Sequence, residues 1–181
     1  FEVGLNIKVG IVSHSDYLGG ADRSAYRLHR ALLKSEIDST MFVDHAATRD
    51  NSVVVPGNKY SRFLKSLKPR LARVLDPLLT SKTDEKLSTA FIPSGWAKFL
   101  NNSDVDVVHL HWPHNEMMSI SDIGKITKPL VSTLHDMWAF TGGCHYSEGC
   151  ERCKENCGNC KVLSSQMSND LSRKTFNRKR K

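Results

Sequence analysis

The chain has 181 residues, of which 39% are hydrophobic and 25% are charged, which is typical of one soluble globular domain and too short for two large ones. No stretch approaches 18 uninterrupted apolar residues, and the first residues lack the basic and apolar regions of a signal peptide, so we expect neither a transmembrane helix nor export. The net charge of +7 lies at the end of the chain, because residues 173–181 carry six Lys or Arg and no acid, whereas the rest holds 20 basic and 19 acidic residues. Such an end can bind polyanions, but it is more often a solvated helix face or a frayed terminus, and we expect no nucleic-acid partner.

The first part of the chain has the pattern strand, glycine turn, helix, strand. Residues 7–12 are rich in β-branched side chains and predict a strand, and a polar loop over 13–18 follows. A helix is predicted from about 21 to 34, with one apolar stripe formed by Ala21, Ala25, Leu28 and Leu32. A second strand is predicted over 39–43. This order is typical of the opening of an α/β doubly wound sheet.

The middle of the chain alternates basic and apolar residues over 59–82, and Pro69 divides this segment into two short helices. A helix at a membrane surface is one interpretation, but amphipathic helices that cover the sheet are favoured because Pro69 interrupts any long interfacial face. Two more strands are predicted over 105–111 and 130–134. Short apolar strands separated by helical stretches predict a Rossmann-like, mostly parallel sheet whose strands are buried on both faces.

Ligands of parallel sheets bind beyond the carboxyl ends of the strands, so the residues that follow each strand are the candidates for a site. Histidines and one tryptophan cluster there, and alternation along the strand places His109 and His111 on one face. A single histidine is usually an ordinary polar residue, but histidines at two neighbouring strand ends favour contacts to a sugar hydroxyl or a phosphate. The predicted binding residues are His109, His111, Trp112 and Asp136, and His135 is the predicted catalytic residue.

Gly19 and Gly20 precede the first helix, where free backbone N–H groups favour an anion, although two glycines also fit a simple tight turn. The chain has no complete G-x-G-x-x-G pattern, so Asp44 is a weak candidate for the ribose-binding acid of an NAD-dependent oxidoreductase, which stays an alternative function. We find no carboxylate pair at acid/base spacing and no G-x-S-x-G turn, so hydrolase functions have little support.

All five cysteines lie in a polar segment, residues 142–161, that has neither helical nor strand periodicity. This clustering differs from the disulfide framework of secreted domains, and without an export signal it favours a reducing cytoplasm. Thiolates at such spacings can surround a tetrahedral zinc ion, while local disulfides and free thiols are the alternatives. A zinc-stabilised binding module is therefore a second alternative function.

Residues 134–146, Leu-His-Asp-Met-Trp-Ala-Phe-Thr-Gly-Gly-Cys-His-Tyr, resemble the signature of bacterial family-4 glycosyltransferases, which are often found in polysaccharide biosynthesis. Three shorter pieces resemble the same family, and together the matches run from about residue 7 to 163. These pieces are Gly19-Gly20-Ala21 with residues 26–29, residues 106–112 and residues 157–160.

This resemblance implies a GT-B fold, in which two Rossmann-like domains face a cleft and the C-terminal one holds most of the nucleotide sugar. It implies retaining, metal-independent transfer with no required cofactor, to a saccharide or lipid-linked saccharide acceptor. A peripheral position at the cytoplasmic face of the plasma membrane is the corresponding expectation. By the same resemblance, Gly19 and Gly20 lie against the donor diphosphate, His135 lies near the transferred sugar or the acceptor hydroxyl, and Asp16 contacts the acceptor.

Two positions depart from the family pattern, because Cys153 replaces an expected tyrosine and Lys161 an expected proline. The expected zinc-binding set is therefore Cys144, Cys150, Cys157 and Cys160. By this resemblance we expect residues 1–181 to be an incomplete N-terminal, acceptor-side domain without the donor-binding half. We therefore expect no transferase turnover from this chain alone.

Overall fold

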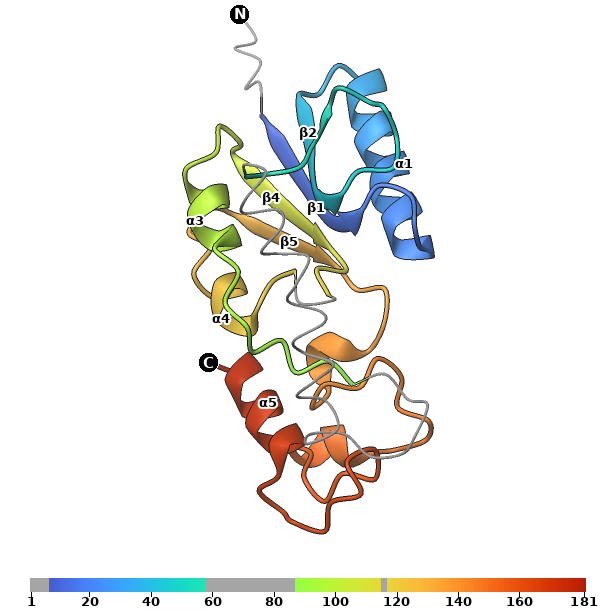
Figure 1. The fold of residues 1–181 in the computed structure, drawn as a ribbon, viewed down its shortest axis with the longest axis vertical. Coiled ribbons are helices and arrows are strands. Elements are labelled where there is room, and N and C mark those ends of the chain that lie inside the picture. The colour runs from blue at the N-terminus through green and yellow to red at the C-terminus, as the bar shows by residue number, and fades with distance from the viewer. Residues whose placement is uncertain (1–6, 58–86, 115–116) are drawn as a thin grey trace, which may run out of the picture.

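The computed structural model describes residues 7–57, 87–114 and 117–181. Its centre is a five-stranded sheet in the order β3-β2-β1-β4-β5, in which every neighbouring pair is parallel (Figure 1). This order is that of a Rossmann half, so the predicted α/β doubly wound fold is confirmed. The strands are β1 Val9–Ser15, β2 Ser39–His45, β3 Val53–Val54, β4 Val107–His111 and β5 Leu130–Thr133.

Helices cover both faces of this sheet, with α1 on one side and α3 and α4 on the other (Figure 1). The predicted helix over 21–34 is confirmed to within one residue, whereas the segment 59–82 lies outside the described residues. Helix α5 and the cysteine-rich segment lie beyond the strand ends toward which the arrows point (Figure 1). The helices are α1 Gly20–Lys34, α3 Trp96–Asn101, α4 Ile120–Ile123 and α5 Leu171–Lys179, with short 3-10 turns η1 Trp138–Phe140 and η2 Arg152–Glu155.

Alternation along β1 builds two separate cores. Ile11 faces α1, where it packs with Met41 and Ala25, and Val12 faces the other layer, where Trp96 and Leu100 are also buried. Burying such a side chain stabilises the fold by roughly 1.5–3 kcal/mol relative to leaving it in water. The sheet is therefore packed on both faces at β1, and the carboxyl ends of its parallel strands lie together at one edge.

Strand β5 differs from the prediction that all strands are buried on both faces. Leu130 is 42% exposed and Val131 is 48% exposed. The reason is that β5 forms an edge of the sheet within the described residues. The prediction of burial is therefore wrong for this strand.

Strand β1 is also longer than predicted, because it continues to Ser15 instead of giving way to a loop at Ser13. Both serines are buried, and Asp22 in the first turn of α1 makes this possible. Its carboxylate accepts hydrogen bonds from Ser13 Oγ at 2.8 Å, from the Ser15 N–H at 3.2 Å and from the Gly19 N–H at 2.9 Å. One buried acid thus holds the strand end and the glycine turn together.

We expect Asp22→Asn to lower the free energy of unfolding by about 2–3 kcal/mol, because an amide NH2 would face N–H donors where a charged acceptor stands. Equilibrium unfolding in urea measures the change. The exposed neighbour substitution Arg23→Ala is the control and should shift the free energy by less than about 0.5 kcal/mol. Equal stability of Asp22→Asn and the wild type would show that the carboxylate does not hold the turn.

Candidate functional site

A cavity of about 270 Å³ lies at the carboxyl ends of β4 and β5, and we call it the strand-end pocket. Its walls come from the segments that follow these two strands, from η1 and from α5. Apolar side chains form much of the wall, and a few polar groups converge on it, which is the usual composition of a small-molecule site. The polar and aromatic lining residues are Trp112, His114, Ser132, Thr133, His135, Asp136, Trp138, Arg178, Lys179 and Lys181.

Three histidines lie in a row on one face of β4 and β5, which confirms that His109 and His111 share a face. His109 Nε2 lies 2.7 Å from Thr133 Oγ1, and the rings of His109 and His111 are 4.3 Å apart. His111 Nδ1 then lies 3.0 Å from His135 Nε2, at the wall of the pocket. Burial, with His109 and His135 nearby, lowers the pKa of His111 to about 4, so His111 is neutral at pH 7.

The hydrogen-bond partners of His111 select its tautomer. The side chain is 2% exposed, and its Nε2 atom has no hydrogen-bond partner among the described residues. A buried N–H without a partner costs more than a lone pair without one, so the proton belongs on Nδ1. Nδ1–H of His111 then donates to His135 Nε2, and because this Nε2 accepts, the ring proton of His135 is on Nδ1.

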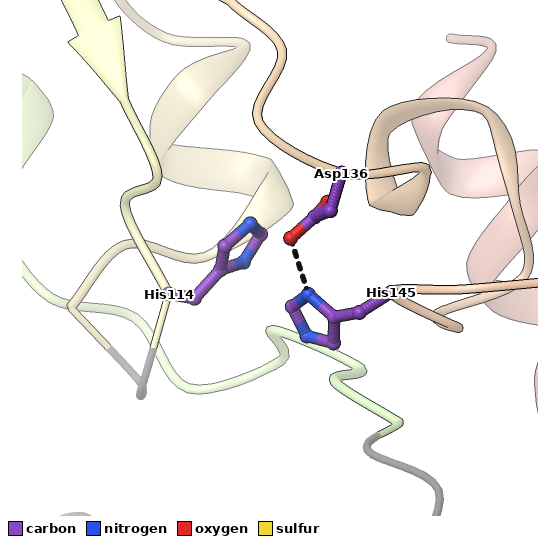
Figure 2. Close-up of side chains that lie close together, drawn as sticks. All are labelled: His114, Asp136 and His145. Atoms are coloured by element: carbon purple, nitrogen blue, oxygen red, sulfur yellow. Dashed lines mark hydrogen bonds and ion pairs between the residues drawn. The ribbon is translucent and has the colours of Figure 1, made fainter. Parts of the chain in front are cut away.

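Asp136 is the centre of a second buried cluster, in which its carboxylate lies between His114 and His145 (Figure 2). Oδ2 accepts from His145 Nδ1 at 2.6 Å and from Trp112 Nε1 at 2.8 Å, and Oδ1 accepts from the Trp138 N–H at 2.8 Å. Burial alone would raise the pKa of Asp136, but the hydrogen bonds from His145, Trp138 and Trp112 lower it. The carboxylate is thus charged and fully engaged.

This cluster brings three possible metal-binding atoms within 4.8 Å of one another, but its bonding does not require a metal ion. His145 is partnered on both nitrogens, because its Nε2 lies 2.8 Å from Ser88 Oγ. Burial lowers the pKa of His114 to about 3, and its ring packs 4.6 Å from that of Trp138. The arrangement therefore works as a hydrogen-bonded support beneath the strand-end pocket.

Trp112 stands directly after β4 with a φ of 46°, in the left-handed region that bulky residues rarely adopt. Its indole N–H is held by Asp136, and its ring lies 6.2 Å from that of His14 on β1. Backbone strain of this kind is found where the surroundings fix a side chain for function. Trp112 is thereby fixed as one wall of the pocket.

The glycine turn and Asp16 lie at the same edge of the sheet but do not line the strand-end pocket. Asp16 is buried and accepts from the backbone N–H groups of Ala47 at 2.7 Å and Thr48 at 2.9 Å, so it ties the loop after β1 to the loop after β2. A Cβ added to Gly20 would meet nothing within 4 Å, which leaves open space at the start of α1. Contacts of Asp16, Gly19 and Gly20 with substrate stay predictions.

Several residues of the site come from parts of the chain outside the strands and the segments that directly follow them. Lys179 of α5 reaches back to the site, with Nζ 3.5 Å from the Trp138 ring centroid and 3.2 Å from the Thr141 carbonyl, and burial lowers its pKa to about 7. Ser88 binds His145 from 57 residues away. Only the motif over 134–146 hinted at Trp138 and His145, and no sequence signal indicated Ser88 or Lys179.

Comparison with known proteins agrees with this architecture. The family described as Glycosyltransferase Family 4 matches residues 18–177. The protein described as "Putative colanic acid biosynthesis glycosyl transferase WcaC" from Escherichia coli (strain K12) is 34% identical over 68 residues, which cover 33% of this chain and 17% of that protein. No solved structure matches significantly, and no described helix is long and apolar enough to cross a membrane. The match over most of its length shows that the chain belongs to glycosyltransferase family 4.

Proposed function

We propose that this chain is the N-terminal, acceptor-side domain of a retaining GT-B glycosyltransferase and that the strand-end pocket holds the sugar between donor and acceptor. The donor is a nucleotide sugar, and the acceptor is a saccharide or lipid-linked saccharide in polysaccharide biosynthesis. The observation that carries the proposal is the position of His135, which lines a 270 Å³ pocket and is oriented by His111 from behind. The E. coli relative, which is named for colanic acid biosynthesis, supports the polysaccharide part.

The chemistry required of such a site is mostly positioning. In transfer, the bond from the anomeric carbon to the diphosphate breaks, a bond to the acceptor oxygen forms, and the acceptor hydroxyl loses its proton. Negative charge grows on the leaving diphosphate, so fixed donors placed near it lower the barrier. Neither a metal ion nor a cofactor is needed for these steps in the proposed mechanism.

His135 is suited to such a role because its proton is placed by its neighbours. With Nε2 occupied by His111, the Nδ1–H is the group with which His135 can meet a sugar hydroxyl or a phosphate oxygen. Trp112 adds a flat apolar surface, against which the carbon-bound hydrogens of a sugar ring can pack. His111 is thus a positioning residue and His135 the proposed catalytic one.

The start of α1 supplies the second half of the proposed donor contact. The first N–H groups of this 15-residue helix have no partners within the helix, and the helix dipole adds partial positive charge there. The free space next to Gly20 allows an anion to approach the backbone. We place the donor diphosphate there, across the cleft from a C-terminal domain that holds the nucleotide.

The whole enzyme's activity is part of the proposal, because the matched segment spans 17% of the E. coli relative. Membership in family 4 favours glycosyl transfer over the NAD-dependent oxidoreductase and over a binding module with no catalytic activity. A peripheral position at the cytoplasmic membrane face, close to a lipid-linked acceptor, belongs to the same proposal.

In the enzyme that also carries the donor-binding domain, we expect His135→Ala to lower kcat/KM at least about tenfold, because one positioned donor is lost in the transition state. Release of the nucleoside diphosphate measures the rate. Lys34→Ala, an exposed change at the far end of α1, is the matched control and should keep wild-type activity. Unchanged kcat/KM in His135→Ala would remove this histidine from the mechanism.

We also expect acid to destabilise the chain through the buried histidine row. The pKa of His111 falls to about 4 in the folded state from an ordinary value of 6.5, so the unfolded chain binds more protons between these two values. The stabilisation is complete above pH 6.5 and is lost as the pH falls toward 4, on the order of 2 kcal/mol at pH 5.

Urea denaturation of the wild type at pH 7 and pH 5 measures this loss. His111→Gln removes the titrating group, so its stability should differ less between the two pH values than that of the wild type. Lys34→Gln controls for an unrelated substitution. An identical pH dependence in His111→Gln and the wild type would contradict the assignment.

A further inference from the structure

All five cysteines of the chain line a single cavity of about 30 Å³, which we call the thiol cavity. Its other walls include Gly142, Gly158 and Ser172 of α5. The strand-end pocket uses none of these thiols. A space of this size is comparable to the volume of one water molecule, so it can hold a single ion when its wall atoms turn inward.

Cys144 interacts with three of the other four thiols. Cys144 shares a sulfur–sulfur hydrogen bond with Cys160 and lies within electrostatic range of Cys157 and Cys150. Cys153, on the η2 turn, lines the same cavity and interacts with Cys157, whereas the thiols that interact with Cys144 are Cys150, Cys157 and Cys160. Around Cys144 the candidate ligand set is therefore completed by Cys150, Cys157 and Cys160, and Cys153 is the fifth cysteine of the cavity.

Backbone N–H groups point at the sulfurs of this set. The N–H groups of Val162 and Leu163 donate to Cys160, and the N–H of Gly142 donates to Cys157. Donors two and three residues after a cysteine stabilise a thiolate, which is the form that binds a metal ion.

The loop that carries these sulfurs has an unusually constrained backbone. Residues 156–159 all have positive φ, with 87° at Asn156, 58° at Cys157, 93° at Gly158 and 46° at Asn159. A Cβ on Gly158 would lie 2.3 Å from the Ser168 carbonyl oxygen, so only glycine fits there. Four left-handed residues in succession cost free energy, which a bound ion would offset.

Positive side chains of α5 balance the charge that four thiolates would bring. Lys179 interacts electrostatically with Cys157 and Cys144. Arg173 donates to the Cys157 carbonyl at 3.1 Å, and its Nε is buried without a hydrogen-bond partner among the described residues. A zinc ion bound by four thiolates has a net charge of −2, so this face of α5 complements it.

We propose that Cys144, Cys150, Cys157 and Cys160 bind one structural Zn²⁺ ion. Zinc holds thiolates at about 2.3 Å, which sets the sulfurs about 3.8 Å apart. Among the described residues, the group of possible ligand atoms within 4.8 Å of one another is that of His114, Asp136 and His145. The four sulfurs are therefore further apart than in a zinc site, and they must move closer together when the ion binds. The ion would fix Cys144, whose neighbour His145 supports the strand-end pocket through Asp136.

The test is metal binding by the complete chain. Protein purified with Zn²⁺ present should hold one zinc ion per chain by elemental analysis. Addition of Co²⁺ to metal-free protein should give the sulfur-to-cobalt charge-transfer band and the intense visible bands of a tetrahedral thiolate site, saturating at one equivalent. This titration needs no variant, so it stands even where a cysteine substitution prevents folding.

The chain offers its own matched control. Cys157→Ser should lose the bound zinc and melt at a lower temperature that no longer rises with Zn²⁺, whereas Cys153→Ser should keep one ion per chain. Absence of a tetrahedral cobalt spectrum in the wild type, or a mass 2 Da lower that reports a Cys144–Cys160 disulfide, overturns the proposal. Equal loss of zinc in Cys153→Ser overturns the assignment of the four ligands.

Discussion

The buried contact between Asp136 and His145, 2.6 Å long, is the interaction on which the site depends. Asp136 follows β5, and His145 belongs to the cysteine-rich segment, so this pair attaches an irregular segment to the end of the sheet. The same carboxylate holds the Trp112 indole and begins the η1 turn through the Trp138 N–H. Loss of any one of these hydrogen bonds would leave a buried polar group without a partner, so this arrangement is strongly favoured over others.

Sequence patterns predicted those parts of the fold that depend on local periodicity. The stripe of Ala25, Leu28 and Leu32 located α1 because helix packing repeats every three to four residues, and the β-branched runs located β1, β2, β4 and β5. Burial of β5 was predicted wrongly because a run such as Leu-Val-Ser-Thr has the same composition at an edge and in the centre of a sheet. Short helices such as Ile120–Ile123 carry too few residues for a period.

The site was only partly visible in the sequence for a related reason. Strand alternation places His109 and His111 on one face, and the parallel order places His135 beside them, so that row follows from local rules. Lys179 and Ser88 reach the site through contacts with residues that are 41 and 57 positions away in the sequence, and no local pattern encodes contacts over such separations. The basic end of the chain likewise suggested a solvated tail, whereas Lys179 is drawn inward by the Trp138 ring and nearby carbonyls.

Helix α5 contributes to both the strand-end pocket and the thiol cavity, so the cysteine-rich segment can support the pocket through this helix. Lys179 lines the pocket and also interacts with Cys144 and Cys157, so whatever fixes the sulfurs fixes one wall of the pocket. Irregular backbone has little stability of its own, because it lacks the repeating hydrogen bonds of helices and strands. Fixing residues 144–160, by a metal ion or by packing, makes the structure rigid at the point where an acceptor must be held in one orientation. A site that acts by positioning its substrates depends most on such rigidity.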